Sequence, residues 1–215
     1  MSVTIVIDPG HGGVDANGEY QTPGKRYVFD DGKIIYEGQR MRVLASFLAA
    51  ELTRLCVPCR SSLTGNTVAL GWRPQTADVS LKHRVRSANA IDGVTLFVSL
   101  HSNAISSSSV GEGQTKASGI SIYTSVGRTE SDLAASYIWK SLKATNLLKM
   151  RSQSYQDGDP DYEAGFYVLK NTRGYAVLIE LGFHDNPSDA DWLLDDDNLL
   201  KAAIAIAAGI TTWVS

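Results

Sequence analysis

Two patterns of apolar residues alternate along this chain. Short runs rich in β-branched side chains are typical of buried strands, and longer stretches with an apolar residue every three or four positions are typical of helices with one buried face. The short runs predict strands at residues 3–7, 57–63, 95–100, 118–124, 166–169 and 175–181. The longer stretches predict helices at residues 37–55, 81–91, 131–146, 188–194 and, after a break at 195–197, 199–214. Strands that alternate with helices predict an α/β fold, with helices on both faces of a mostly parallel sheet.

Polar segments rich in glycine, aspartate and serine connect these elements. Residues 14–35 are expected to form an irregular loop with a hairpin near 27–35, and 64–80, 106–113 and 151–163 are expected to form further loops. The chain has 215 residues and no internal repeat, so residues 1–215 are expected to form a single domain. The helical spacing directs these side chains toward the core: Met41, Leu44, Leu48, Leu52, Leu81, Val85, Ala88, Leu133, Tyr137, Ile138, Trp139 and Leu142.

Composition and charge narrow the class of protein. Hydrophobic residues make up 43% of the chain and charged residues 20%, which is ordinary for a soluble globular protein. The formal net charge is −3 and no block of Lys or Arg occurs, so the chain lacks the electrostatic footprint of a nucleic-acid-binding protein. The longest apolar runs are far too short for a membrane span. The N-terminus enters the first strand without a charged leader or an apolar segment, so we expect no classical signal peptide in this chain.

Two cysteines, Cys56 and Cys59, form the sequence C-V-P-C. A redox pair of this spacing would be expected to open a helix after a strand, whereas this one closes a helix. We therefore favour two small apolar residues at a helix-to-strand junction over a redox pair. A zinc site here would need two further ligands, and no other cysteine remains.

Polar residues follow three of the predicted strands at the point where each strand ends. Residues 3–7 lead through Pro9 and Gly10 to His11, residues 95–100 lead directly to His101, and the strand at 175–181 carries Glu180 after the apolar run A-V-L-I. In open α/β sheets, ligands bind outside the carboxyl ends of the strands. Two imidazoles and one carboxylate are therefore expected to gather at one edge of the sheet.

A second carboxylate, Glu37, opens the first long helix. It lies four residues before Met41 and therefore on the buried face of that helix. One explanation is that it stabilises the positive end of the helix dipole, by about 0.3–1 kcal/mol. That explanation does not account for an inward position, whereas a metal ion would, so we favour Glu37 as a ligand. His83 lies on a different helix face beside Lys82 and Arg84, and is expected to be a surface histidine.

The set His11, Glu37 and His101 is a normal first shell for catalytic zinc, with the fourth position left for water. Zinc lowers the pKa of its water to about 7 and polarises a carbonyl oxygen. Hydrolysis also needs a general base that is not a ligand, and Glu180 is the natural candidate. The alternative for Glu180 is a strand-end carboxylate that accepts backbone hydrogen bonds. His184 is a further candidate for either role.

Two other chemistries fit less well. No G-x-S-x-G sequence is present, and the serine-rich loop lacks the strand–elbow–helix context of a serine hydrolase. The sequence D-P-G-H-G-G lacks the spacing of a phosphate-binding loop, and no helix opens directly after it.

Several motifs are spread over nearly the whole chain: V-I-D-P-G-H-G-G, the helix-opening Glu, L-K-H-R-V-R-S-A-N, V-S-L-H-S-N-A, S-G-I-S-I-Y-T and V-L-I-E-L-G-F-H-D-N. Together these motifs resemble the zinc-dependent N-acetylmuramoyl-L-alanine amidases of the Amidase_3 type. The resemblance implies that His11, Glu37 and His101 hold Zn²⁺, that Glu180 is the catalytic carboxylate, and that the central sheet has six strands. It also implies the substrate, peptidoglycan, and the reaction, hydrolysis of the amide between the lactyl group of N-acetylmuramic acid and L-alanine.

The chain departs from the family pattern near the site. G-Q-R-M follows the helix-opening Glu in place of an acidic or Asn-rich continuation, and the loop at 14–36 is long. Residues 104–118 contain no convincing helix that would plug the site, so we expect an open cleft. The sequence suggests a phage endolysin released through holin pores, or the catalytic domain of a secreted autolysin. The rival functions are a zinc peptidase that cuts the stem peptide and a catalytically dead wall-binding module.

Overall fold

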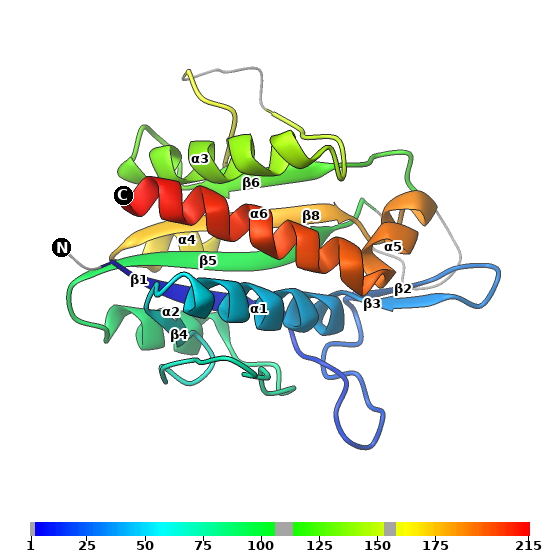
Figure 1. Cartoon of the computed structure of the whole chain (residues 1–215). Helices are drawn as coiled ribbons and strands as arrows, with labels where there is room; N and C mark the ends of the chain where they lie inside the picture. Colours follow the sequence, from blue (N-terminus) through cyan, green and yellow to red (C-terminus); the bar gives the residue numbers. More distant parts are fainter. Residues whose placement is uncertain (1–2, 106–113, 153–157) are drawn as a thin grey trace.

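A six-stranded mixed sheet forms the centre of the protein (Figure 1). The computed structural model describes residues 3–105, 114–152 and 158–215. Strand β1 (Val3–Pro9) pairs in parallel with β4 (Cys59–Ser61) and with β5 (Val94–Asn103). Strand β8 (Tyr175–Phe183) pairs in parallel with β5 and antiparallel with β6 (Ile120–Thr124). The predicted single-domain fold with a mostly parallel, six-stranded sheet is therefore confirmed. In spatial order the strands are β4 (Cys59–Ser61), β1 (Val3–Pro9), β5 (Val94–Asn103), β8 (Tyr175–Phe183), β6 (Ile120–Thr124) and β7 (Tyr162–Glu163).

Helices cover both faces of this sheet, as the sequence predicts. The long helices α1 (Glu37–Arg54), α3 (Glu130–Thr145) and α6 (Asp196–Val214) lie side by side in front of the sheet in Figure 1. The short helices α2 (Leu81–Asn89) and α4 (Tyr167–Asn171) pack against each other on the opposite face. The remaining elements are α5 (Pro187–Leu194), which follows β8, and the hairpin of β2 (Arg26–Val28) and β3 (Ile34–Tyr36).

The period-two alternation of strand side chains divides the core into two layers. Ile5 and Ile7 of β1 point into the large cluster beneath the long helices, whereas Val6 between them joins the small cluster beneath α2 and α4. The parallel register then continues this alternation across the sheet. It pairs Asp8 with Ser99 and His101 with Glu180. The polar residues that end the strands are thus brought together by the same register that aligns the apolar core.

One predicted strand is wrong. Residues 166–169 were expected to be extended, but residues Tyr167–Asn171 form the helix α4. Val168 and Leu169 are buried in the small cluster, and a short apolar run does not distinguish a strand from a turn of helix. The helix is the outcome because the Lys170 amide donates to the Phe166 carbonyl and α4 packs on α2. In addition, Tyr162 and Glu163, expected in a loop, form the short edge strand β7.

Two predicted core residues are exposed. Leu133 lies on the outer side of α3, whose inner face instead carries Ala134, Ala135 and Ile138. This face of α3 includes the small residues Ala134 and Ala135 because α3 packs closely on α6: a Cβ atom at Gly209 would lie 2.6 Å from the Cα atom of Ile138. Leu81 is also exposed, because it is the first residue of α2 and the helix buries its next turn. Tyr137 is half-buried, and the other predicted core residues of the helices are buried.

The other boundaries match the sequence closely. The hairpin forms at the expected place, and Asp195 separates α5 from α6 as the expected break. Cys56 follows Leu55, the residue that caps the end of α1, and Cys59 lies in β4; both are free thiols. Residues 106–113, predicted to be a loop, and most of the segment examined for a plug helix lie outside the described residues.

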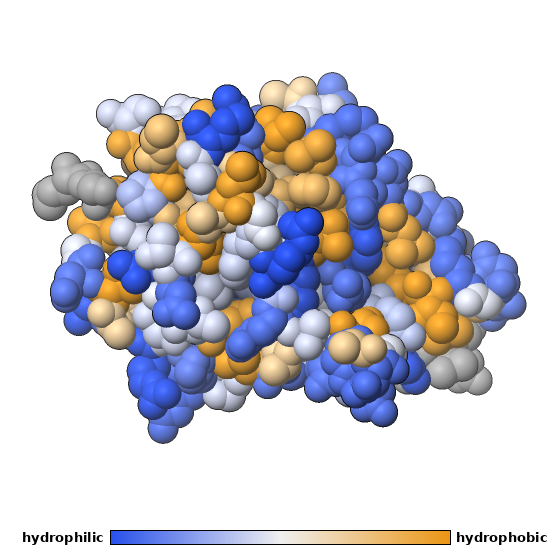
Figure 2. Space-filling model, turned by 60° about the horizontal axis from the view of Figure 1, so that its bottom comes forward, coloured by the Kyte–Doolittle hydropathy of each residue, from blue (hydrophilic) through white to orange (hydrophobic). Residues whose placement is uncertain are grey.

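The surface mixes apolar and polar groups. Figure 2 turns the lower part of Figure 1 toward the reader and shows hydrophobic residues interspersed with hydrophilic ones over this face. None of the helices in the described ranges combines the length and apolar character that a membrane crossing requires.

Candidate active site

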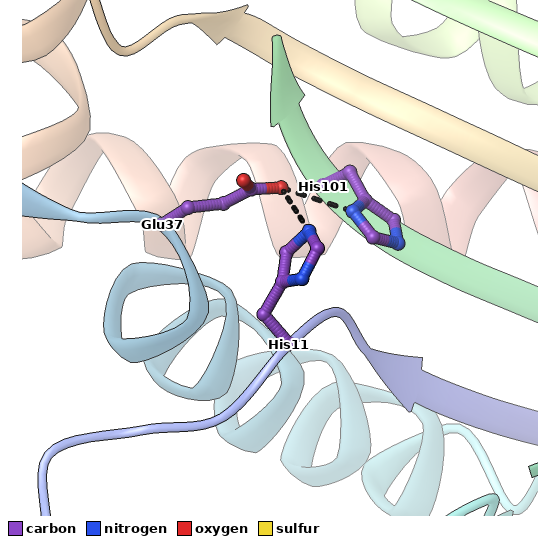
Figure 3. Close-up of side chains that lie close together, drawn as sticks. All are labelled: His11, Glu37 and His101. Carbon is purple, nitrogen blue, oxygen red and sulfur yellow. Dashed lines mark hydrogen bonds and ion pairs between the residues drawn. The ribbon is translucent and has the colours of Figure 1, made fainter. Parts of the chain in front are cut away.

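Three side chains from separate elements converge beyond the ends of β1 and β5 (Figure 3). His11 comes from the loop after β1, Glu37 from the first residue of α1, and His101 from β5. Glu37 Oε1 lies 3.3 Å from His11 Nε2 and 2.9 Å from His101 Nδ1. One ligand atom from each residue lies within 4.8 Å of the other two. The structure therefore brings together all three side chains that the sequence predicts as metal ligands.

The backbone of His11 has an unusual conformation that glycine neighbours accommodate. Its φ of 57° lies in the left-handed region, which non-glycine residues seldom adopt. Gly10 before it packs directly on the His101 ring, since a Cβ atom there would lie 2.4 Å from Cε1 of that ring. The Gly10 amide also donates to the Leu100 carbonyl at 2.9 Å, which extends the β1–β5 pairing to the site. The two imidazoles consequently meet edge to face, with ring centroids 5.0 Å apart.

Glu37 reaches the imidazoles because the start of α1 lies against the loop after β1. A Cβ atom at Gly38 would lie only 1.9 Å from the Gly12 carbonyl oxygen, so only glycine permits this approach. The Ser102 amide donates to Glu37 Oε1 at 3.3 Å. The glycine after Glu37, which departs from the family pattern, thus has a clear packing role.

The site is strongly polar although it is largely buried. Burial alone would raise the pKa of Glu37, but the hydrogen bonds and charges of His101 and His11 hold it far below its usual value. Burial alone would lower the pKa of His101, but its hydrogen bond with Glu37 and the charges of Glu37 and Glu180 raise it. Without a metal ion, Glu37 and His101 therefore stabilise each other in their charged forms.

Glu180 lies beside this triad and outside it. It is the direct register partner of His101 on the neighbouring strand, yet it does not belong to the group of three that shares one potential ion. Burial raises the pKa of Glu180 to about 7. The charge of His101 lowers this pKa, and the nearby charge of Glu37 raises it. Its Oε2 atom is buried and has no hydrogen-bond partner among the described residues. An inward carboxylate oxygen without a partner suits proton transfer better than a structural role.

His184, the further candidate, lines the same pocket but faces Ser102. Its Nδ1 lies 3.1 Å from the Ser102 carbonyl oxygen and 3.0 Å from the Ser102 hydroxyl. Burial lowers the pKa of His184, so the neutral ring is favoured. Because Ser102 in turn donates to Glu37, His184 supports the ligand shell from behind.

A buried arginine that the sequence interpretation placed on an outer helix face holds the His11 loop. Arg84 is 1% exposed. Its Nη1 donates to Asp8 Oδ1 at 2.8 Å and to the Pro9 carbonyl at 2.6 Å, and its Nη2 donates to the His11 carbonyl at 2.9 Å. Asp8 is completed by the hydroxyls of Ser62 and Ser99, at 2.5 and 2.6 Å. The charged pair is therefore fully hydrogen-bonded, as burial requires.

A second arginine holds the same loop from the side of α1. Arg42 Nη2 donates to the His11 carbonyl at 2.9 Å, and its Nη1 donates to the carbonyls of Gly38 and Gly10 at 3.0 and 3.3 Å. Two guanidinium groups thus share one carbonyl oxygen and connect the loop to both helices. The available sequence signal for Arg84 was its spacing of four from Ala88, which the sequence predicts to be buried.

The triad, Glu180 and His184 open into a pocket of about 340 Å³. Its wall also includes residues of the hairpin and of the end of β5: Gly24, Lys25, Arg26, Ser102, Asn103, Ala104 and Ile105. A larger depression, of about 700 Å³, lies at the opposite ends of β5 and β8. The predicted catalytic and ligand residues all lie at the smaller pocket.

Comparison with known proteins identifies the family. The family described as N-acetylmuramoyl-L-alanine amidase (Amidase_3) matches residues 5–212, nearly the whole chain. The chain belongs to this family. The amidase-family motifs lie on the elements that carry the triad and Glu180, so the family assignment and the site geometry point to the same residues.

Curated relatives of this amidase-family chain are longer than it is. An uncharacterized cell wall amidase of Bacillus anthracis is 30% identical over 98% of this chain and 35% of its own length. A probable cell wall amidase, LytH, of Staphylococcus epidermidis is 29% identical over 99% of this chain and 58% of its own length. The chain thus spans between about a third and three fifths of these two relatives.

A solved structure agrees over the whole domain. The N-acetylmuramoyl-L-alanine amidase of Clostridium difficile 630 superposes with a TM-score of 0.74 at 25% identity, covering 99% of this chain and 97% of that one. The chain is therefore an amidase-type catalytic domain in fold. The donor set also fits a zinc ion, because two imidazoles and one carboxylate, with ligand atoms within 4.8 Å of one another, are the donors of a standard zinc shell.

Proposed function

We propose that this protein is a zinc-dependent hydrolase that cleaves the amide between the lactyl group of N-acetylmuramic acid and L-alanine in peptidoglycan. The family assignment supports the reaction class. The observation that carries the proposal is the pairing of a three-ligand group with a separate carboxylate in one pocket. His101 and Glu180 are register partners, so the ligand and the proton carrier are fixed relative to each other by two paired strands.

In this mechanism His11, Glu37 and His101 hold the metal. A bound zinc ion would supply Lewis acidity, which lowers the pKa of water and polarises a carbonyl oxygen. Glu37 contributes the negative charge of the shell, and Ser102 and Gly38 fix its direction. Arg84 and Arg42 keep His11 in its left-handed conformation and so keep its ring beside Glu37.

Glu180 moves the proton. Its Oε2 atom takes a proton from the attacking water and then delivers it to the nitrogen of the departing L-alanine. The products are a muramic acid carboxylate and a peptide with a free amino terminus. A positioned general base of this kind contributes about 10²–10⁴ in rate. A divalent ion held by the triad would lower the pKa of Glu180 and so favour the ionised base at neutral pH.

Two other functions make different predictions for the same pocket. A zinc peptidase would use the same residues on a bond within the stem peptide. A wall-binding module without activity would not need its proton carrier. Here the three ligand side chains lie close together, and Glu180 is the register partner of one of them, His101. The cell wall is the proposed place of action. Release through holin pores, or origin as a domain of a secreted autolysin, stays a prediction of the sequence.

The deciding experiment is mass spectrometry of purified sacculi after digestion. We expect new L-alanine amino termini and intact glycan strands, with zinc bound to the enzyme and turbidity loss abolished by a chelator and restored by zinc. Cleavage inside the stem peptide would show that the protein is a zinc peptidase and not an amidase. Sacculi that bind the protein but release no product, with zinc present, would support the binding module.

A further inference from the structure

Two adjacent cations, Lys25 and Arg26, line the pocket of the triad, and we call them the cation pair. Neither side chain makes a hydrogen bond or an ion pair with any described residue. The Nε atom of Arg26 is buried and has no partner there. A buried donor without an acceptor is costly, typically by about 1–3 kcal/mol, so it indicates that a ligand completes it.

Other cations around the site differ in this respect. Arg42 and Arg84 donate to loop carbonyls, and Lys33 on the turn of the same hairpin pairs with Asp191 at 2.6 Å. The cation pair is set apart because it faces the pocket and keeps its charge available. Lys25 is also close enough to Glu180 for its charge to oppose the rise in the pKa of that carboxyl.

The backbone of the cation pair is attached to the metal-ligand helix. The Lys25 carbonyl accepts the Glu37 amide at 3.1 Å and the Tyr20 hydroxyl at 2.8 Å, and that hydroxyl accepts the Gly38 amide at 3.0 Å. Arg26 pairs with Tyr36, the residue before Glu37. The two cations therefore stand at a fixed offset from the triad, as a recognition site beside a reacting bond requires.

We propose that the cation pair is a carboxylate-binding subsite for the stem peptide on the L-alanine side of the scissile amide. This inference rests on the proposed amidase function. The pocket already contains the carboxylates of Glu37 and Glu180, which repel an acidic peptide. A guanidinium and an ammonium offset that repulsion, and the planar guanidinium binds a carboxylate through paired donors. The residue after L-alanine in the stem peptide is the ligand, through its free carboxyl group.

The test compares two soluble muramoyl peptides that differ only in that group, which is a carboxylate in one and a carboxamide in the other. With the zinc-loaded wild type, we expect kcat/KM to favour the carboxylate by about ten- to hundredfold, mainly through KM. The preference should shrink as salt is added, because exposed charges are screened. Equal kcat/KM for the two peptides would overturn the subsite, and this measurement needs no variant.

Variants then locate the effect. Lys25→Met and Arg26→Gln, singly and together, should reduce the preference, and the double variant should remove it. The matched control is Lys170→Met with Arg173→Gln, which deletes the same two charges at the opposite ends of the strands and should keep the wild-type preference. Thermal unfolding of every variant identifies any loss of folding. An unchanged preference in a folded double variant would overturn the assignment.

A direct binding measurement separates this inference from the proposed function. The released peptide with a free carboxylate should bind the wild type at least about tenfold more tightly than the carboxamide peptide, and the folded double variant should bind both alike. N-acetylmuramic acid, whose carboxylate lies on the other side of the bond, should not compete. Cleavage of both substrates at the muramoyl amide without selectivity would refute the subsite alone. Cleavage elsewhere in the peptide would refute the amidase.

Discussion

The two ends of β5 and β8 carry depressions of different size and chemistry. The amino ends, around Val94, Thr95 and Tyr175, border the larger one, of about 700 Å³. The carboxyl ends, with His101 and Glu180, border the smaller one, of about 340 Å³. None of the described residues that line the larger depression is a histidine or a cysteine.

The metal-ligating groups therefore identify the candidate site better than the volume of the pocket does. The small pocket combines fully buried charge with a glycine-permitted close approach of three elements, which is costly to build without a ligand. The large depression lies over strand starts and helix ends, where loops leave space. We therefore expect the two edges to respond very differently to the same kinds of substitution.

A raised pKa alone does not distinguish Glu180 from other buried carboxyl groups. Burial and the neighbouring Asp159 raise the pKa of Asp161 to about 8, and its Oδ2 accepts the Thr124 hydroxyl. Glu180 has a smaller rise but lies in register with a ligand histidine. Among the described residues, the triad is the only group of three or more side chains able to share an ion. Geometry is therefore the reason why we propose Glu180, and not Asp161, as the catalytic carboxyl.

The largest effect should come from removing a ligand at the carboxyl edge. We expect His11→Ala to lose zinc and, with it, the metal-dependent turbidity loss of sacculi, a larger loss than the about 10²–10⁴ that removal of a general base costs. Metal content of the purified protein checks the first part. The control is His83→Ala, which removes a histidine bonded to the Leu63 carbonyl and should retain zinc and activity. Full zinc occupancy in His11→Ala would contradict the assigned shell.

A smaller loss should follow removal of the proton carrier. Glu180→Gln should keep its zinc, because Glu180 is outside the triad, while kcat falls by about 10²–10⁴. Metal analysis and steady-state kinetics on a soluble muramoyl peptide measure the two effects separately. If zinc is lost together with activity, Glu180 is a ligand and the division of roles is wrong.

Behind the ligands, Arg84→Met should weaken the site through the His11 loop. The substitution leaves Asp8 buried without its cation, so we expect about 3–5 kcal/mol less stability and about 10–100-fold weaker zinc binding. Urea unfolding and chelator competition measure these quantities. Arg86→Met on the exposed side of the same helix is the control. Normal zinc affinity in a folded Arg84→Met protein would show that the loop holds His11 without it.

The stability of the metal-free protein should depend on pH because Glu180 is buried. Its folded pKa, about 7, lies above its ordinary 4.5, so its favourable contribution is complete below pH 4.5 and is lost as the pH rises through 7. Glu180→Gln stays neutral and should therefore gain stability relative to the wild type between pH 5 and 8, by about 1–3 kcal/mol. Urea unfolding in a chelator at three pH values measures the difference. A difference that does not change with pH would exclude this cause.

The smallest effect should come from the amino edge. Lys170→Ala and Thr172→Ala alter the wall of the larger depression but touch no ligand or proton carrier. We expect less than about 0.5 kcal/mol change in stability for such surface substitutions and unchanged kcat/KM on muramoyl peptides. A clear loss of activity in either variant would remove the functional contrast between the two edges.

Local patterns in the sequence were sufficient to predict the layered fold and to propose four site positions. Strand runs and helical spacing depend on local periodicity, which the chain carries explicitly. His11, His101 and Glu180 could be predicted because each lies where a recognisable strand ends, and Glu37 because it begins an amphipathic helix on its buried side. Parallel register then brings such positions together with little further choice.

The features that the sequence did not predict depend on contacts between distant segments of the chain. Arg84 is buried because Asp8, Pro9 and the His11 carbonyl supply its acceptors, and no pattern within α2 contains those partners. Residues Tyr167–Asn171 are helical because α2 offers a surface to pack on, and Leu133 is outside because the approach of α6 admits only small side chains. The cation pair faces the pocket because the hairpin is bonded to the start of α1. Local sequence encodes which residues alternate, whereas packing between segments selects which polar groups are buried and what they face.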